Sequence, residues 1–295
     1  MANQDQRGFS LIEAIVSLVV LGIIGATVGL FITLPLRGAA DLANRADLTD
    51  AGDAAIREID RNLRSALPNS LRITSVGSVV YLEYLQLRTE GRYRSVTSGA
   101  ATTASSCPDT NGNTLDDEDA LNFSAADTCF RSIGAVTNLG SIVGGNDYLV
   151  LQNLGTGVAG KNAYEFTGTG GNKSLIASAV VTSGNENRIT FASHTFPFAA
   201  PGSRFHVIAG PVTYVCDPGS GQLRRQSGYA ITTAQAAPPV GPTANVLVAG
   251  NMSACGFVYA ATATESGGVL STSLTLTRNN ESVTLQYGTS INNVP

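Results

Sequence analysis

The chain has 295 residues, of which 43% are hydrophobic and only 14% are charged, and its formal net charge is -4. A hydrophobic content of this size can build a sizeable core, which excludes a disordered protein. The acidic balance offers no general basic surface to a nucleic-acid backbone, so we expect no nucleic-acid partner.

The chain begins with a short polar segment and continues into a long apolar one. Residues 14–34 carry no charge, and as a helix rising about 1.5 Å per residue they would span about 31 Å, which matches a bilayer core. The alternative is a cleaved secretory signal peptide, with Gly38-Ala39-Ala40 as its cleavage site, but such a peptide has a shorter apolar core. The length therefore favours a retained membrane anchor.

A carboxylate, Glu13, interrupts the apolar run that begins at Phe9. It costs about 2 to 4 kcal/mol at the centre of a bilayer and less near the edge. The residues around it resemble the processing site of type IV prepilins and pseudopilins, in the order Arg7-Gly8-Phe9-Ser10-Leu11-Ile12-Glu13.

This resemblance has three implications for the N-terminal residues. A prepilin peptidase cleaves between Gly8 and Phe9 and methylates the new N-terminal Phe9. Glu13 pairs with the N-terminal amine of a neighbouring subunit. Apolar association contributes little free energy in lipid, so we expect this polar pair to set the register of assembly.

The helix is predicted to continue well beyond the membrane. We divide the chain into a leader at 1–8, a helix at 9–67 and a β-rich domain at 68–295; the helix comprises an anchor at about 9–36 and an amphipathic half at 37–67. The apolar residues that share roughly one face are Leu42, Ile56, Ile59, Leu63 and Leu67, and Pro68 is predicted to end the helix. The residues that lower helix propensity in the anchor are Gly22, Gly25, Gly29 and Pro35. They fit either ordinary glycine tolerance in membranes or a helix that partly melts in a filament.

The helical period disappears after Pro68, and β signals replace it. Runs rich in β-branched and aromatic residues predict strands at 71–76, 79–87, 148–154, 174–182, 204–209, 212–216, 270–277 and 282–287. Asn279-Asn280 predicts a hairpin turn between the last two runs. The predicted fold class is therefore α+β, with the long N-terminal helix packed on an antiparallel β-rich domain.

The four cysteines lie downstream of the apolar segment and are even in number, which indicates an oxidising compartment. Three pairings are possible, and we favour the sequence-local one, Cys107 with Cys129 and Cys216 with Cys255. Each bridge would stabilise the fold by about 3 to 4 kcal/mol in the chain-entropy model. The cysteines lack the CxxC spacing of zinc sites, which argues against a metal-thiolate centre.

An acidic segment between Cys107 and Cys129 is a candidate calcium site. Its oxygen-bearing side chains alternate as hard cations require, and the candidate ligands are Asp109, Asn111, Asn113, Asp116 and Asp117. The segment departs from an EF-hand because Thr114 occupies the glycine position and Ala120 the position of the bidentate glutamate. A solvated loop without metal is the favoured alternative, so no cofactor is expected apart from this possible calcium.

Two other features resemble functional motifs but lack the neighbouring residues that those motifs require. Residues 155–162 resemble a phosphate-binding loop, but the following residues predict no helix, and Asn162 replaces the magnesium-binding hydroxyl. His194 and His206 form no spacing typical of a nucleophile and its base. The sequence therefore predicts a flexible loop, structural histidines and no enzyme.

The resemblance also extends into the β-rich domain. This chain resembles minor pilins of MSHA-type type IV pili at residues 64–70, 91–94, 216–255 and 292–295. Such minor pilins are also similar to the J-type pseudopilins of type II secretion. The resemblance implies a single-pass protein of the inner membrane with a periplasmic C-terminal domain, later part of a surface pilus. The implied partners are major and minor pilins, the prepilin peptidase and the inner-membrane assembly platform. The alternatives are a secretion pseudopilin, or an adhesin or calcium-dependent binding module within 70–295.

Overall fold

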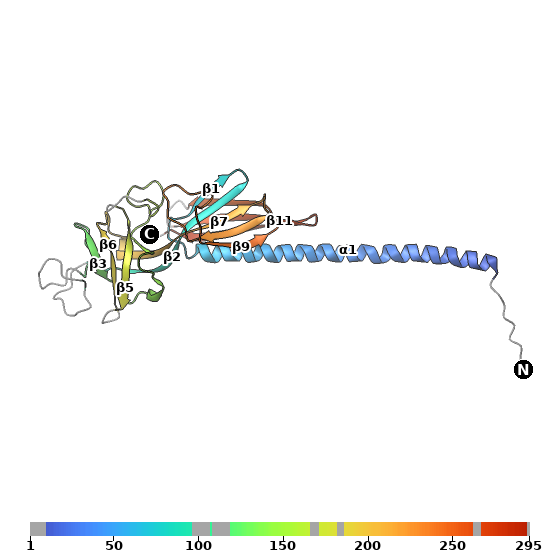
Figure 1. Ribbon diagram of the computed structural model, residues 1–295, viewed down its shortest axis with the longest axis horizontal. Helices are drawn as coiled ribbons and strands as arrows, with labels where there is room; N and C mark the ends of the chain where they lie inside the picture. Colours follow the sequence, from blue (N-terminus) through green and yellow to red (C-terminus); the bar gives the residue numbers. More distant parts are fainter. Residues whose placement is uncertain are drawn as a thin grey trace, which may run out of the picture.

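The computed structural model describes residues 10–95, 107, 119–165, 171–181, 186–261 and 267–293. One long helix, α1, emerges from a β-rich body, and its N-terminal part extends far beyond that body (Figure 1). The arrangement confirms the predicted α+β class, with the helix packed on antiparallel strands.

Helix α1 runs without interruption over Leu11–Leu63, through the glycines and the proline that lower its propensity. It ends before the predicted Leu67, because the chain there turns to pair with a strand. The Leu67 N–H donates to the Leu85 carbonyl at 2.8 Å, and the Leu87 N–H donates to the Ser65 carbonyl at 2.9 Å. The predicted helix end was therefore wrong, and strand pairing rather than the following proline stops the helix.

Strands make up most of the remaining described residues. They are β1 (Arg72–Val76), β2 (Val79–Arg92), β3 (Asp127–Arg131), β4 (Tyr148–Val150), β5 (Lys173–Val181), β6 (Asn187–His194), β7 (Arg204–Asp217), β8 (Gln222–Ser227), β9 (Ala244–Gly250), β10 (Met252–Ala261), β11 (Gly267–Arg278) and β12 (Glu281–Asn292). The 3-10 helices in the described part of the chain are η1 (Leu139–Ser141) and η3 (Pro201–Ser203).

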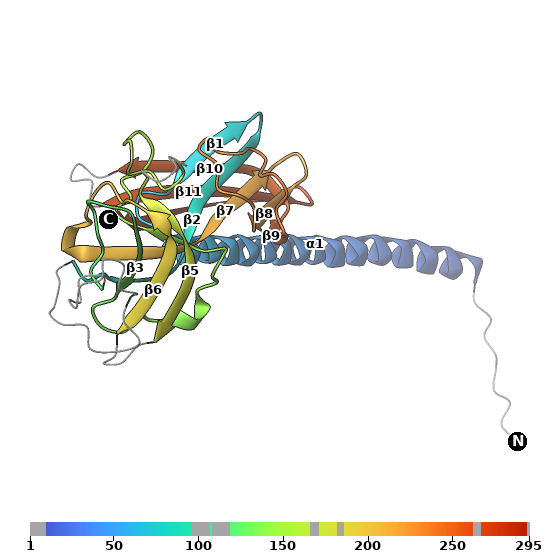
Figure 2. The same cartoon turned by 60° about the vertical axis from the view of Figure 1, so that its left-hand side comes forward.

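The strands form two antiparallel sheets. A nine-stranded sheet has the order β1-β2-β7-β4-β5-β6-β3, with β8 paired to β7 and β9 paired to β8. A three-stranded sheet has the order β10-β11-β12. The turned view in Figure 2 separates β3, β5 and β6 from the strands near α1. The Cys216–Cys255 disulfide connects β7 with β10 and so joins the two sheets covalently.

The C-terminal half of α1 lies where the two sheets share a core. Leu48, Ile59 and Leu63 are each 1% exposed. They belong to one apolar cluster with residues of both sheets, which include Tyr214, Leu223, Leu274 and Leu276. Leu42, predicted on the same face, is 70% exposed because it precedes the part of the helix that the core covers. The amphipathic half therefore docks over a shorter length than predicted.

The strand predictions were accurate at the ends of the domain and weaker inside it. The β11–β12 hairpin is confirmed, and its turn residues Asn279 and Asn280 have φ values of 52° and 66°. The break predicted between 209 and 212 was wrong, because β7 continues through Gly210 and Pro211. The partner strand β2 shifts register opposite this point, and such irregularities accommodate a residue without an N–H. Strands β3, β6, β8, β9 and β10 were not predicted.

Gly52 permits close contact between α1 and β12, and its replacement tests this docking. A Cβ at Gly52 would overlap the Leu285 side chain, and Leu276 Cδ1 would lie 3.2 Å away, whereas Gly38 has open space around it. We expect Gly52→Leu to lower the free energy of unfolding by about 1 to 3 kcal/mol through overpacking. Gly38→Leu should leave it unchanged or raise it slightly. Thermal unfolding of both full-length variants in detergent is the measurement, and equal midpoints would contradict this account of the docking.

Candidate functional site

The N-terminal end of α1 carries the residues to which the sequence assigned assembly. Ser10 has extended backbone angles and caps the helix, because its Oγ accepts a hydrogen bond from the Glu13 N–H at 3.3 Å. The Ser-x-x-Glu spacing is a capping-box signal, and this local pattern could have predicted Ser10 as the cap. Gly8 and Phe9, the predicted cleavage residues, lie outside the described residues.

The first turns of α1 are suited to lipid rather than to a protein core. The segment Leu11–Gly29 has a mean hydropathy of 2.4, and none of it is buried within the protein. The Thr27 hydroxyl donates to the Ile23 and Ile24 carbonyls at 3.1 and 2.9 Å, which satisfies its polar group inside the helix. The length, the composition and the exposure are those of a membrane anchor.

The carboxylate of Glu13 is exposed at the start of this anchor. Among the described residues it forms no ion pair, so its charge is available to a group that lies outside them. The hydrogen bond from its backbone N–H to Ser10 fixes the helix start but does not use the carboxylate. The structure thus places the backbone of Glu13 in the helix cap and leaves its side chain exposed.

The β11–β12 hairpin makes polar contacts with α1 where the helix leaves the body. Arg278 donates to Asp47 Oδ2 at 2.8 Å and to Asn44 Oδ1 at 3.0 Å. Arg45 lies 3.5 Å from Glu281 on the other side of the hairpin turn. Exposed pairs of this kind contribute at most about 1 kcal/mol each. They orient the exit of the helix, and the apolar core holds it.

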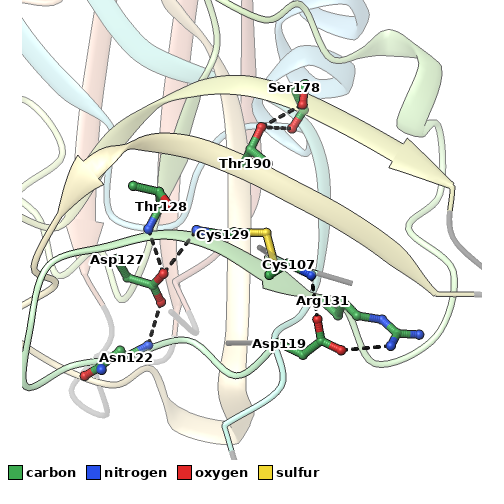
Figure 3. The surroundings of a disulfide bond; sticks show 9 residues. All are labelled: Cys107, Asp119, Asn122, Asp127, Thr128, Cys129, Arg131, Ser178 and Thr190. Carbon is green, nitrogen blue, oxygen red and sulfur yellow. Dashed lines mark hydrogen bonds and ion pairs between the residues drawn. A yellow bond between two sulfur atoms is a disulfide. The ribbon is translucent and has the colours of Figure 1, made fainter. Parts of the chain in front are cut away.

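Both disulfides follow the sequence-local pairing. Figure 3 shows the Cys107–Cys129 bond, beside which Asp119 accepts a hydrogen bond from the Cys107 N–H at 2.9 Å. The same carboxylate pairs with Arg131 at 2.8 Å and is almost fully buried. The disulfide and the Asp119–Arg131 ion pair together fix Cys107 and Asp119 beside β3.

The acidic segment itself lies outside the described residues. This applies to every predicted calcium ligand, namely Asp109, Asn111, Asn113, Asp116 and Asp117. Within the described part of the chain, no cluster of three or more histidine, cysteine, aspartate or glutamate side chains could hold a metal ion. The calcium hypothesis therefore stays a prediction.

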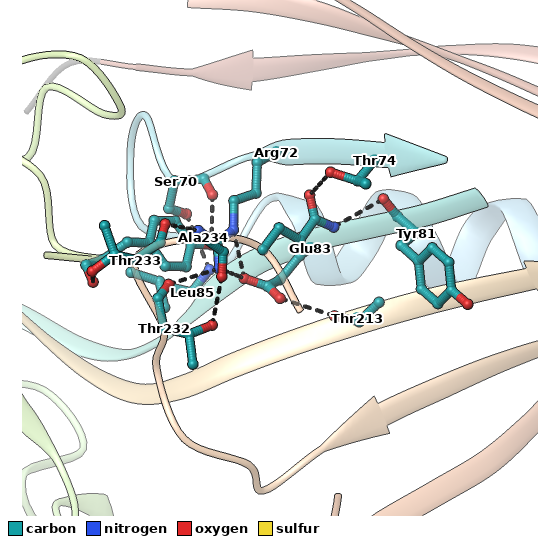
Figure 4. A network of polar contacts seen from close by, with 12 residues as sticks. Ser70, Arg72, Thr74, Tyr81, Glu83, Leu85, Thr213, Thr232, Thr233 and Ala234 are labelled. Atoms are coloured by element: carbon teal, nitrogen blue, oxygen red, sulfur yellow. Dashed lines mark hydrogen bonds and ion pairs between the residues drawn. The ribbon is translucent and has the colours of Figure 1, made fainter. Parts of the chain in front are cut away.

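A buried polar network surrounds Glu83 inside the body (Figure 4). Arg72 donates to the fully buried Glu83 carboxylate at 2.7 Å, and Thr213 and Tyr229 hydroxyls reach its second oxygen at 3.3 and 3.2 Å. Burial raises the pKa of Glu83, and the neighbouring Arg72 opposes this rise.

Arg72 connects this network to the segment between β8 and β9. Its guanidinium donates to the Thr232 and Thr233 carbonyls at 3.0 and 2.8 Å and lies 3.6 Å from the centre of the Tyr164 ring. Gln235 bridges the Thr74 hydroxyl and the Tyr81 carbonyl nearby. These contacts fasten a segment of chain against β1 and β2. The network contains no activated nucleophile, and its geometry indicates a structural role.

The two histidines lie apart and have structural partners. His194 bonds to the Gly171 carbonyl at 2.6 Å and contacts the Phe196 ring edge-on. His206 lies 3.6 Å from Glu90, and burial lowers its pKa. Residues 155–162 form a loop, and the described residues that follow it, 163–165, are not helical; the Lys161 ammonium lies over the Phe198 ring. Neither arrangement provides a phosphate cradle or a catalytic pair.

Comparison with known families identifies the N-terminal segment. Residues 3–29 match the family described as "Prokaryotic N-terminal methylation motif". Comparison with curated proteins and with solved structures finds no match. The matched residues include Gly8, Phe9 and Glu13 but none of the β-rich body. The chain thus carries an N-terminal signal like that of type IV pilins and pseudopilins, which is consistent with anchoring in the inner membrane before assembly.

The Glu83 network predicts a pH dependence of stability. Because burial raises the pKa of Glu83 above 4.5 in the folded state, the folded protein retains a proton that the unfolded chain releases. The contribution of Glu83 to the free energy of unfolding is fully present below pH 4.5, and it is lost as the pH rises through the folded-state pKa of Glu83. Glu83→Gln should remove this component. Urea unfolding of both proteins across this range is the measurement, and a pH-independent difference between their free energies would contradict the assignment.

Proposed function

We propose that this chain is a minor pilin of an MSHA-type type IV pilus, similar to MshO, which initiates filament assembly or forms part of the tip. The observation that carries this proposal is the Gly8-Phe9 step, followed by Glu13 at the entrance of an anchor helix. It is supported by the continuity of that helix with an exported, disulfide-bonded body. The work of such a protein is contact between subunits rather than catalysis.

The MSHA assignment has separate support from the β-rich body. The similar segments are residues 64–70, where the chain leaves α1, 91–94 at the end of β2, and 216–255, which a disulfide closes. The proposed partners are other major and minor pilins, the prepilin peptidase and the inner-membrane assembly platform. The proposed route is a single-pass inner-membrane protein with a periplasmic body that later joins a pilus on the cell surface, where it can affect adhesion.

Glu13 is proposed to pair with the N-terminal amine of a neighbouring subunit. Cleavage after Gly8 creates a positive amine at Phe9, close to the exposed Glu13 carboxylate of an adjacent helix. In a low dielectric the two charges attract strongly, but desolvation of both ions limits the net free energy. The pair therefore specifies the axial register of neighbouring helices more than it stabilises them.

Processing and filament formation test the assignment together. The intact mass of the mature protein should correspond to a chain that begins at methylated Phe9. Deletion of the gene should remove surface filaments and leave the secreted proteome unchanged. Retention of residues 1–8, or loss of the chain through Ala40, would refute processing as a pilin. Lost secretion with intact filaments would instead identify a pseudopilin.

Replacement of Glu13 tests its role in assembly. We expect Glu13→Val to reduce crosslinking to partner pilins at least about tenfold, the change that about 1.4 kcal/mol of lost pairing produces. Membrane insertion and cleavage after Gly8 should persist, because the apolar segment is intact. Ser10→Ala is the matched control, since it removes the helix cap and keeps the carboxylate. Equal crosslinking by Glu13→Val and the wild type would mean that the carboxylate has no such role.

A further inference from the structure

Strand β12 forms one edge of the three-stranded sheet, and its pairing with β11 has no irregularity. The register runs unbroken from Arg278 opposite Glu281 to Gly267 opposite Asn292. The Asn279-Asn280 turn has positive φ at both residues, which is the two-residue hairpin geometry in which the residues flanking the turn form a hydrogen-bonded pair. The hydrogen-bonding direction therefore alternates from Glu281 onward.

This alternation identifies the backbone groups that point away from β11. Odd-numbered residues of β12 use their N–H and C=O groups on β11, so even-numbered residues direct theirs to the free edge. The outward-directed residues are Ser282, Thr284, Gln286, Gly288 and Ser290. All of them are exposed. Gly288 has no side chain, so its exposure is exposure of the backbone itself.

These outward groups have no hydrogen-bond partner within the described part of the chain. An unpaired edge of this length is a template for another strand, and proteins normally protect such edges with charge, proline or a bulge. Residues 282–292 contain no charged residue and no proline, and no bulge interrupts the pairing. The edge of β12 is thus long, regular and unprotected.

The other sheet edges in the described structure differ in this respect. Arg72 holds the 232–235 segment beside β1. On β3, the Arg131 N–H donates to Asp119 and its carbonyl accepts from Arg94. The pairing of β10 with β11 contains a register shift between Met252 and Ala254, and a disulfide ties β10 to β7. The pairing of the shorter β9 with β8 contains a register shift at Leu223 and Arg224. Among these edge strands, β12 is the longest, and its pairing contains no register shift.

We infer that the β12 edge is a docking site for an extended, uncharged strand of a neighbouring filament subunit, which adds to the three-stranded sheet through backbone hydrogen bonds. Donor and acceptor pairs that recur every two residues, about 6.8 Å apart, match the backbone of another strand and no other common ligand. Strand addition itself follows from the edge, whereas the identity of the partner as a filament subunit rests on the proposed function.

The side chains along the edge define what the added strand contains. Val283, Leu285 and Tyr287 share the face that turns toward α1, and Tyr287 is 44% exposed beside the end of the helix. The other face of β12 carries Ser, Thr, Gln and Gly. A fitting strand alternates apolar and small polar residues, so that its apolar side chains extend the column next to Tyr287. Residues 282–292 offer no charged side chain to pair with a charged strand.

Site-specific photo-crosslinking in whole cells tests the inference. The probe is the full-length chain with a benzophenone amino acid at Thr284. We expect a crosslink to an extended segment of another filament subunit. In Gln286→Pro, which removes one outward N–H and leaves the β11 pairing intact, this product should fall at least about tenfold. Gln286→Ala is the matched control, because it keeps that N–H, and its product should persist.

A second control separates docking at the edge from docking on the face. Ser273 lies directly opposite Gln286 on the same face of the central strand, so Ser273→Lys should block a partner on the face and spare one at the edge. Loss of the product in Ser273→Lys but not in Gln286→Pro would overturn strand addition. A chain that is cleaved after Gly8 but gives no crosslink would overturn it also, with the proposed function intact. Failure of cleavage would refute the function alone.

Hydrogen exchange of the wild-type chain covers the case in which Gln286→Pro fails to fold. In the purified protein, amides 282, 284, 286 and 288 should exchange quickly, while 283, 285, 287 and 289 exchange slowly. In isolated filaments the first group should become protected at least about tenfold, as expected for newly paired backbone amides. Unchanged fast exchange at the even-numbered amides in filaments would overturn the inference.

Discussion

One continuous helix has to be stable both in lipid and in a protein core, and the rest of the structure depends on this constraint. Leu11–Gly29 of α1 exposes apolar side chains on every side, as lipid requires, whereas Leu48–Leu63 buries one face between two sheets. Burial of each large aliphatic side chain on that face contributes about 1.5 to 3 kcal/mol. The exposed pairs of Arg278 and Arg45 contribute much less. Apolar packing therefore holds the body on the helix, and the surface pairs set the angle at which the helix leaves.

The two sheets and the segment between β8 and β9 must keep their places around α1. A disulfide and a buried ion pair hold them there. The Cys216–Cys255 disulfide joins the sheets at the apolar cluster that α1 also enters, and it limits the unfolded chain rather than adding contacts to the folded one. The Arg72–Glu83 pair fixes the segment between β8 and β9 but carries the desolvation cost of two buried charges. A buried ion pair with this desolvation cost favours one specific arrangement of the chain more than it raises the free energy of unfolding. The raised pKa of Glu83 shows that burial outweighs the attraction of Arg72.

The sequence predicted what depends on local pattern and missed what depends on distant pairing. The anchor, the Asn279-Asn280 hairpin and the residues around Gly8 and Glu13 each have a signal within a few residues. Strands β3, β6, β8, β9 and β10 were missed, because polar or small residues interrupt their alternation and partners elsewhere in the chain complete them. The helix end could not be predicted for the same reason, since the bond from Leu67 to Leu85 is a tertiary contact. The open edge of β12 depends on the absence of a partner strand, which no pattern within β12 itself predicts.

In the proposed assembly, Glu13 and the β12 edge would constrain two different degrees of freedom of neighbouring helices. A point contact between a carboxylate and an amine fixes how far one helix slides along another, but rotation about the helix axis remains free. A row of backbone hydrogen bonds fixes direction and register over several residues, because a slip by one residue would turn every side chain to the opposite face. The apolar packing of α1 on β11 and β12 couples the two, since it holds the β11–β12 hairpin at a set orientation to α1. A subunit equipped in this way could accept a neighbour in one orientation only, which is the property that the first subunits of a filament need.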